Sequence, residues 1–140
     1  MSVEIRSMNP EDYEAVEALW KASPGVGLSP TDTREGVVRF LERNRGSSFV
    51  AFREGALVGA VLCGHDGRRG FISHLAVESS SRRLGLGRAL VERCIGALRE
   101  SSIDKAHIFV FAENEKAVAF WKKIGWGERS ELVMLSRYTA

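Results

Sequence analysis

The segment from Leu75 to Arg88 constrains the fold of this 140-residue chain most, because an apolar strand pattern there runs into a glycine loop. After the loop, apolar residues recur four apart, which predicts a helix with one buried face. They are Leu86, Leu90, Cys94 and Leu98. Gly85 and Gly87 stand where the first turn of this helix begins. Backbone amides at that turn have no partner within the helix, so the sequence predicts exposed N–H donors.

This predicted turn has the properties of an anion site. A helix N-terminus carries partial positive charge, and bare glycine backbone lets a ligand approach closely. Arg82, Arg83 and Arg88 add formal charge around it, and a guanidinium matches the geometry of a phosphate. We therefore expect the chain to bind a polyphosphate. A plain strand–helix turn, with glycine only for tightness, is the alternative for the loop taken alone.

The kind of polyphosphate can be narrowed from the residues around the loop. A dinucleotide fingerprint needs a small residue three positions after the second glycine, where this chain has the bulky Leu90. No Gly-Lys-Ser/Thr follows the loop, so a nucleoside-triphosphate P-loop is unsupported. Neither of these nucleotide-binding patterns accounts for the loop.

Composition indicates a single small domain spanning residues 1–140, with 44% apolar residues and a net charge of +2. We expect no nucleic-acid partner, because the chain has no block of Lys and Arg of the kind that binds a duplex. The apolar run from Val58 to Cys63 is far too short to cross a membrane. The acidic N-terminus lacks the apolar core of a signal peptide. We therefore expect a cytoplasmic protein with no membrane partner.

The two cysteines, Cys63 and Cys94, fall on apolar patterns and lack metal-ligand spacing. A reduced, buried pair is therefore expected, and no bound metal.

Hydrophobic periodicity predicts an alternating order of strands and helices. Strands are expected at 3–8, 49–52, 57–63, 71–77, 106–111 (buried) and 132–135. Helices are expected from Asn9-Pro10, from a capping box at Asp32…Glu35, over 86–99, and from Asn114 to a stop at Gly125. These elements predict an α/β or α+β fold, with a mixed, mainly antiparallel central sheet and helices on both faces.

Two motifs resemble those of the GNAT superfamily of N-acetyltransferases. Arg82-x-x-Gly85-x-Gly87, after Leu75-Ala76-Val77, resembles the acetyl-CoA-binding signature, which is Gln/Arg-x-x-Gly-x-Gly/Ala. Asn114-x-x-Ala117-x-x-Phe120-Trp121-x-x-x-Gly125-Trp126 resembles the second motif, in which Asn opens a helix that ends in Gly-Phe or Gly-Tyr. Both motifs lie in the expected order and spacing, so the resemblance covers nearly the whole chain.

The resemblance implies a GNAT-like sheet in which the strand before the glycine loop and the next strand splay apart. The arm of acetyl-CoA would pair with the exposed strand edge, because its two amides complement free backbone groups. The Leu75 N–H would act as an oxyanion donor to the thioester carbonyl. The implied cofactor contacts are Leu75, Ala76, Val77, Arg82, Arg83, Leu84, Gly85, Leu86, Gly87, Arg88, Asn114 and Trp121.

The reaction implied by the resemblance moves an acetyl group from acetyl-CoA to a primary amine by direct attack in a ternary complex. Most members have a tyrosine as thiol proton donor where this chain has Trp121, and an indole is not a usable acid. A glutamate found in some relatives is replaced by Phe109. These two departures favour the alternative function, a catalytically degenerate acyl-CoA-binding sensor or interaction module.

His74 is the candidate base on the strand that ends at Val77. Strand alternation places it opposite Leu75 unless a bulge re-aims it. A structural or solvent-facing histidine, with a base that acts through water, is the alternative.

The loop between the first two helices is expected to choose the acceptor, a small-molecule or peptide amine. Trp20, Leu28 and Asp32 are its candidate substrate contacts, with Asp32 or Glu35 holding a cationic amine. For Asp32, a simple helix cap is the alternative. The resemblance leaves a homodimer open, since dimers are common among relatives.

Overall fold

The structure is a computed structural model and describes residues 2–140. The chain forms two compact units, the first ending at Phe109 and the second running from Val110 to Ala140. All strands of the described residues lie in the first unit, together with α1, α2 and α3, and the second unit contains α4.

The first unit is built on a five-stranded sheet in the order β1-β2-β3-β4-β5. Neighbouring strands pair antiparallel from β1 to β4, whereas β4 and β5 pair parallel. The strands are β1 (Val3–Ser7), β2 (Phe49–Arg53), β3 (Ala56–His65), β4 (Gly70–Val77) and β5 (Ala106–Ile108). The predicted mixed, mainly antiparallel sheet is confirmed.

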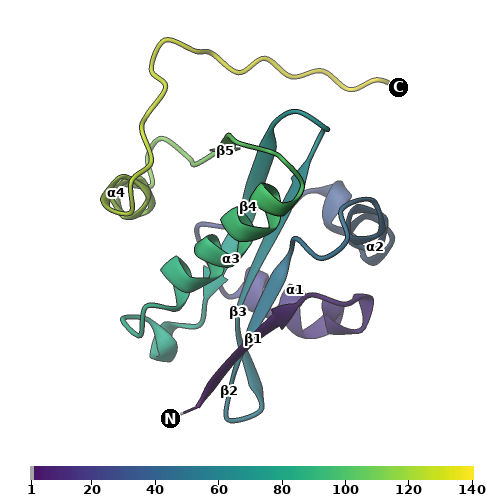
Figure 1. The fold of residues 1–140 in the computed structure, drawn as a ribbon, viewed down its shortest axis with the longest axis vertical. Helices are drawn as coiled ribbons and strands as arrows, with labels where there is room; N and C mark the ends of the chain where they lie inside the picture. The colour runs from purple at the N-terminus through teal and green to yellow at the C-terminus, as the bar shows by residue number, and fades with distance from the viewer. Residues whose placement is uncertain (1) are drawn as a thin grey trace. The chain divides into compact units, whose positions relative to one another are not determined.

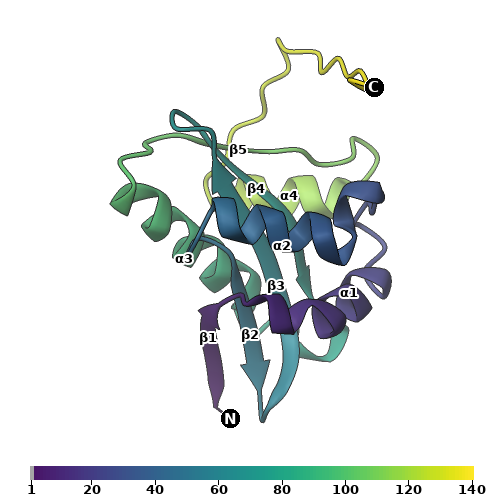
Figure 2. The same cartoon turned by 90° about the vertical axis from the view of Figure 1, so that its right-hand side faces the viewer.

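Helices cover both faces of this sheet, as Figures 1 and 2 show. On one face lie α1 (Tyr13–Lys21) and α2 (Arg34–Arg43), which bury a core against alternate residues of the strands. The buried strand residues of this core are Val50, Ala60, Leu62 and Ala76. Trp20 is its largest fully buried side chain.

The other face is covered by α3 (Leu86–Glu100). The four positions predicted to be buried are indeed buried, with exposures of 5% for Leu86, 0% for Leu90 and Cys94, and 2% for Leu98. Gly70 of β4 lets this helix approach closely, because a Cβ there would lie 2.5 Å from Leu98 Cδ1. The close approach packs the C-terminal end of α3 against the start of β4.

The predicted splay of two strands is present between β4 and β5. Their pairing covers only three positions and ends at Ile72 and Ile108. Residues 73–77 of β4 therefore have no partner from β5, whereas Ser73, Ala76 and Val77 pair with β3 on the other side.

A bulge in β4 begins where this pairing ends. Leu62 pairs with Ser73 and Ala60 with Ala76, so two steps along β3 match three steps along β4. One extra residue is inserted in β4, and His74 takes it up with a φ of 53°. Strand alternation places His74 opposite Leu75 unless a bulge changes the direction of its side chain, and such a bulge is present.

Two of the predicted strands are wrong in part or in full. The fifth strand ends at Ile108, not at residue 111, and is half-buried, with Phe109 66% exposed. No strand forms at 132–135 among the described residues of the second unit. Leu132 is 60% exposed and Leu135 is 90% exposed. Alternating apolar residues form a strand only when a neighbouring backbone pairs with them, and here none does.

The predicted capping box at Asp32 and Glu35 is also wrong. Thr33 is the N-cap of α2, and its hydroxyl accepts a hydrogen bond from the Gly36 amide at 3.2 Å. Asp32 instead closes the short 3-10 turn η2 (Pro30–Asp32), where its carboxylate accepts from the Ser29 amide at 2.9 Å. The box is shifted by three residues because proline at position 30 starts a separate turn.

The second unit contains α4 (Glu115–Lys123), which begins and ends as predicted. The Asn114 side chain accepts a hydrogen bond from the Ala117 amide at 3.1 Å. After α4, Gly125 adopts a φ of 105°, and the Trp126 amide donates back to the Trp121 carbonyl. A left-handed glycine of this kind is a common helix stop.

Candidate functional site

A row of free backbone amides marks the N-terminus of α3. Gly85 is the N-cap, in a left-handed conformation with a φ of 78°, and no side chain caps the helix. The first backbone bond of the helix runs from the Ala89 amide to the Gly85 carbonyl at 3.0 Å. The amides of Leu86, Gly87 and Arg88 precede that bond, so they remain available to an anion.

The arginines predicted around this turn are exposed and free for a ligand. Arg82, Arg83 and Arg88 are exposed, and none of the ion pairs found within residues 2–140 includes them. Arg82 Nε donates to the Val77 carbonyl at 3.1 Å, which ties the loop to the end of β4. The structure thus brings the glycine loop and the free edge of β4 together.

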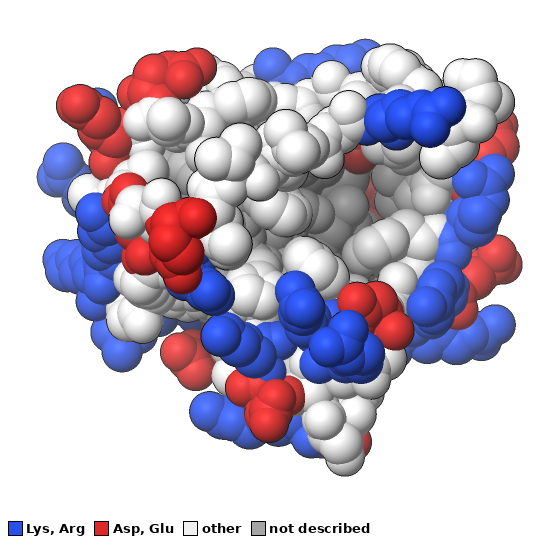
Figure 3. Space-filling model, turned by 90° about the horizontal axis from the view of Figure 1, so that it is seen from above, with Lys and Arg blue, Asp and Glu red and all other residues white. Residues whose placement is uncertain are grey.

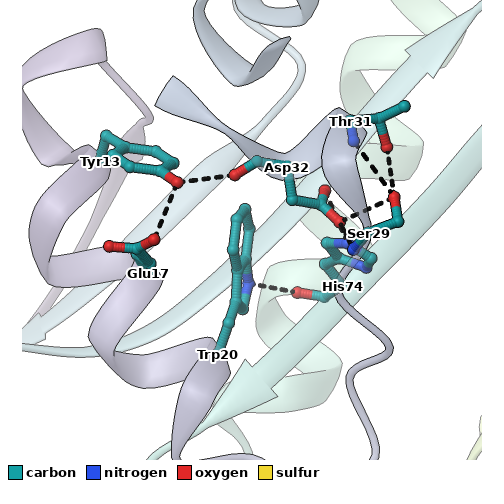
Figure 4. A network of polar contacts seen from close by, with 7 residues as sticks. All are labelled: Tyr13, Glu17, Trp20, Ser29, Thr31, Asp32 and His74. Atoms are coloured by element: carbon teal, nitrogen blue, oxygen red, sulfur yellow. Dashed lines mark hydrogen bonds and ion pairs between the residues drawn. The ribbon is translucent and has the colours of Figure 1, made fainter. Parts of the chain in front are cut away.

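The second part of the candidate site is a polar network around the β4 bulge, shown in Figure 4. His74 Nε2 lies 2.9 Å from Asp32 Oδ1, with side-chain exposures of 18% and 11%. Trp20 Nε1 donates to the His74 carbonyl at 3.2 Å, and the two rings meet edge to face at 5.0 Å. Residues from α1, η2 and β4 therefore converge on one histidine.

Asp32 is itself held from two sides. Its Oδ2 accepts from the Ser29 amide at 2.9 Å, and its backbone carbonyl lies 2.6 Å from the Tyr13 hydroxyl. That hydroxyl is also 3.1 Å from Glu17 Oε2. Burial, followed by the hydrogen bond with Glu17, raises the pKa of Tyr13 above its ordinary value, so the hydroxyl stays protonated. It thus remains a donor that fixes the Asp32 backbone.

Backbone strain is also present at His74. A φ of 53° at His74 lies in the left-handed region that non-glycine residues rarely adopt. Such a conformation costs about 1–3 kcal/mol and persists where surrounding contacts enforce it, often at functional sites. The contacts from Trp20 and Asp32 enforce it here.

The other predicted site residues lie in three different settings. Leu28 is 40% exposed in the loop between α1 and α2, whereas Trp20 is 1% exposed in the core. Asn114 and Trp121 belong to the second unit. There Trp121 is 6% exposed and packs edge to face with Trp126, at 4.9 Å between ring centroids.

Tyr13 and Ser29 are parts of the network that sequence reasoning missed. Tyr13 was grouped with the apolar side of the first helix, and Ser29 with a loop. The available signal for a capped turn was the proline that follows Ser29, together with Asp32 three residues after Ser29.

Charge on the surface is mixed in sign. Figure 3 shows Lys and Arg side chains interspersed with Asp and Glu. Within residues 2–140, no group of three or more His, Cys, Asp and Glu side chains is placed to hold a metal ion. None of the helices in this part of the chain is long and apolar enough to cross a membrane.

Comparison with known proteins agrees with this geometry. Residues 13–126 match the model of the acetyltransferase (GNAT) family. An acetyltransferase of Pectobacterium atrosepticum is 31% identical over 123 residues, which covers 87% of this chain and 86% of the relative. An acetyltransferase of Yersinia enterocolitica is 30% identical over 136 residues, which covers 96% and 94%.

Solved structures show the same fold. Ard1 from Thermoplasma volcanium superimposes with a TM-score of 0.78 at 25% identity, covering 89% of this chain and 82% of that one. The PaiA N-acetyltransferase from Thermoplasma acidophilum, solved in complex with coenzyme A, gives a TM-score of 0.76 at 19% identity, covering 89% of each chain. The chain therefore belongs to the acetyltransferase (GNAT) family, whose members are acyl-transferring enzymes.

Proposed function

We propose that this protein transfers the acetyl group of acetyl-CoA to a primary amine, by direct attack of the amine in a ternary complex. One observation carries the proposal. The N-terminus of α3, which has free backbone amides, is joined by the Arg82–Val77 hydrogen bond to the part of β4 that has no partner from β5. One feature suits a diphosphate and the other suits an extended amide-bearing arm. Coenzyme A bound to a protein of the same fold supports this ligand.

The diphosphate would be held by the residues of the loop. Backbone amides of Leu86, Gly87 and Arg88 would donate to phosphate oxygens, with the dipole of α3 behind them. The exposed guanidiniums of Arg82, Arg83 and Arg88 would add charge from the loop side. Gly85 and Leu84 complete the turn, and Asn114 and Trp121 of the second motif are proposed as further cofactor contacts.

The β4 edge from Leu75 to Val77 would hold the arm of the cofactor. Because peptide 74–75 is planar and trans, the Leu75 N–H points away from the side on which Trp20 binds the His74 carbonyl. We propose this N–H as the oxyanion donor. A donor of this kind lowers the barrier to acyl transfer by about 3–4 kcal/mol. When bound, acetyl-CoA supplies the acetyl group as a thioester.

The variant Gly87→Asp tests the cofactor site. A carboxylate in the first turn of α3 favours the helix dipole, so the variant should fold, yet it repels and displaces a phosphate at the free amides. We expect calorimetry to show at least a hundredfold weaker binding of acetyl-CoA. Gly96→Asp is the matched control, because it adds the same charge in the middle of α3, where a side chain has open space. Equal affinity of wild type and a folded Gly87→Asp would contradict the proposal.

Turnover is tested by thiol release from acetyl-CoA over a panel of primary amines. Amine-dependent release of CoA is the expected result. Binding of acetyl-CoA without release above background for any amine would instead favour an acyl-CoA sensor.

A further inference from the structure

We propose that His74 Nδ1 accepts the proton of the attacking amine, and that Asp32 is the positioning residue that keeps this nitrogen unprotonated. The inference rests on the proposed function, because it names the base of that same site. Its starting observation is the contact between His74 Nε2 and Asp32 Oδ1 at 2.9 Å.

This contact selects one tautomer of the imidazole. A carboxylate only accepts hydrogen bonds, so Nε2 must carry the proton that points to Asp32. The proton of a neutral ring is then absent from Nδ1, which keeps its lone pair. The same division of roles operates when an aspartate orients the histidine of a hydrolase triad.

Nδ1 is accessible to a substrate. Within residues 2–140, no side-chain nitrogen or oxygen that is shielded from solvent lacks a hydrogen-bond partner. The only hydrogen bond found for the His74 ring within the same residues is that of Nε2. Nδ1 is therefore open to solvent, although the ring as a whole is largely buried.

The bulge residue His74 lies directly beside the proposed reaction site in the sequence. His74 is the residue before Leu75, the proposed oxyanion donor, and it lies just beyond Ile72, where β4 parts from β5. In a regular strand Ser73 and Ala76 would face opposite sides, but both lie on the side of α1 and α2, because the inserted residue breaks the alternation. The positive φ of His74 therefore accompanies a change in the alternation of side chains along β4.

Hydrogen bonds with Ser29 and Tyr13 leave Asp32 little conformational freedom. Its second carboxylate oxygen accepts from the Ser29 amide, and its carbonyl is fixed by the Tyr13 hydroxyl. With both oxygens engaged, Asp32 is better suited to orient the imidazole than to hold a cationic substrate. The titratable groups around His74 are Asp32 on η2, and Tyr13 and Glu17 on α1.

The proposed step balances as follows. A bond forms between the amine nitrogen and the acetyl carbon, and the carbon–sulfur bond breaks, with its electron pair leaving on the CoA thiolate. One proton passes from the amine nitrogen to His74 Nδ1. The thiolate takes a proton from water, and the imidazolium returns its proton to solvent.

The tautomer is tested first, without any substrate. The chain has only three histidines, so ¹⁵N imidazole spectra of the free enzyme at mildly alkaline pH can be assigned with His65→Asn and His107→Asn. We expect protonated Nε2 and unprotonated Nδ1 at His74. In Asp32→Asn, the amide can face Nε2 as a donor, so we expect the proton to move to Nδ1. A wild-type ring protonated on Nδ1, or no change in Asp32→Asn, would overturn the positioning role.

The base is tested by kinetics with the most active amine of the panel. His74→Asn suits the left-handed backbone but cannot take the proton, and we expect kcat/KM to fall about 10²–10⁴-fold while the affinity for acetyl-CoA is kept. The decline of kcat/KM toward acidic pH should disappear. The kcat/KM of His74→Gly should fall by the same factor and should recover when free imidazole is added. His65→Asn is the control, since His65 is the last residue of β3, at the far end of the hairpin from the bulge.

The outcomes separate the two proposals. Wild-type kcat/KM in a folded His74→Asn, or no imidazole rescue of His74→Gly, would refute the base while leaving the acetyltransferase intact. If the wild type acetylates no amine, the proposed function fails, and the base with it.

Discussion

Trp20 Nε1 donates a hydrogen bond of 3.2 Å to the backbone carbonyl of His74, and so links α1 to the bulge of β4. The indole is 1% exposed, so the donor of this bond belongs to the core. In a regular strand the carbonyl of His74 would lie in the plane of the sheet. Here the bond from Trp20 holds it toward α1 instead. A core residue thereby controls the direction of a site residue on the neighbouring strand.

Replacing this donor should affect both stability and turnover. Trp20→Phe keeps an aromatic ring but leaves the buried carbonyl without its donor, which costs about 1–3 kcal/mol. We expect a melting temperature lower by roughly 2–12 °C and a reduced kcat, with the affinity for acetyl-CoA retained. Thermal unfolding, calorimetry and thiol release measure the three quantities. Unchanged kcat in this variant would show that the bulge does not need the indole.

The exposed guanidiniums predict that cofactor affinity depends on salt. Arg83→Ala removes one exposed charge from the loop, so we expect acetyl-CoA to bind about 2–5-fold more weakly at low ionic strength. The loss should shrink as salt screens the remaining charges. Calorimetric titrations at several salt concentrations measure it, and Arg45→Ala, an exposed arginine outside the loop, is the control. Identical salt dependence in wild type and Arg83→Ala would place Arg83 away from the phosphates.

The two cysteines should be inert in the folded protein. Cys63 and Cys94 are both 0% exposed. A hydrogen bond with Cys63, together with burial, raises the pKa of the Cys94 thiol far above its ordinary value. Since the thiolate is the reactive form, we expect iodoacetamide at mildly alkaline pH to label neither thiol until the protein is unfolded in guanidinium. Mass spectrometry counts the labels, and rapid labelling of the native protein would contradict the buried pair.

Acid should weaken the anchor of β1 to the turn before α1. Arg6 holds both oxygens of Asp12 at 2.8 Å, and the Asn9 amide donates to Asp12 Oδ2 at 2.8 Å. Burial alone would raise the pKa of Asp12, but these hydrogen bonds outweigh it, and the pKa is lowered. The charged form is therefore favoured by folding. This stability is fully present above the unfolded value of about 3.9, and is lost as pH falls through the lower folded value.

The variant Asp12→Asn isolates this contribution. We expect it to lower the free energy of unfolding by about 1–3 kcal/mol at neutral pH, and to flatten the decline below about pH 4. Urea unfolding across this range measures both effects. Asp104→Asn, at an exposed position before β5, should keep the wild-type acid profile. A wild-type acid profile in Asp12→Asn as well would mean that other carboxylates govern the decline.

Local patterns accounted for much of the fold. The helix from Leu86, its glycine start, the Asn114 cap and the Gly125 stop were all predicted correctly, because each depends on residues within one or two turns. The error at Asp32 is also local, since two overlapping cap patterns competed there and proline at position 30 decided between them.

Strand ends were harder to predict, because pairing is set by distant partners. Residues 132–135 alternate as a strand should, but no neighbouring backbone meets them among the described residues. The fifth strand stops at Ile108, where its pairing with β4 ends just before the bulge, and nothing in residues 106–111 records that event.

The sequence by itself determined the helix start that offers free amides beside three arginines, since capping and charge are local properties. Only the tertiary structure decided that Asp32 meets His74, which lies 42 positions later. A bulge depends on the register between two strands, and a contact across it depends on how α1 and η2 pack on the sheet. Both are non-local, so neither could be read from the residues beside them.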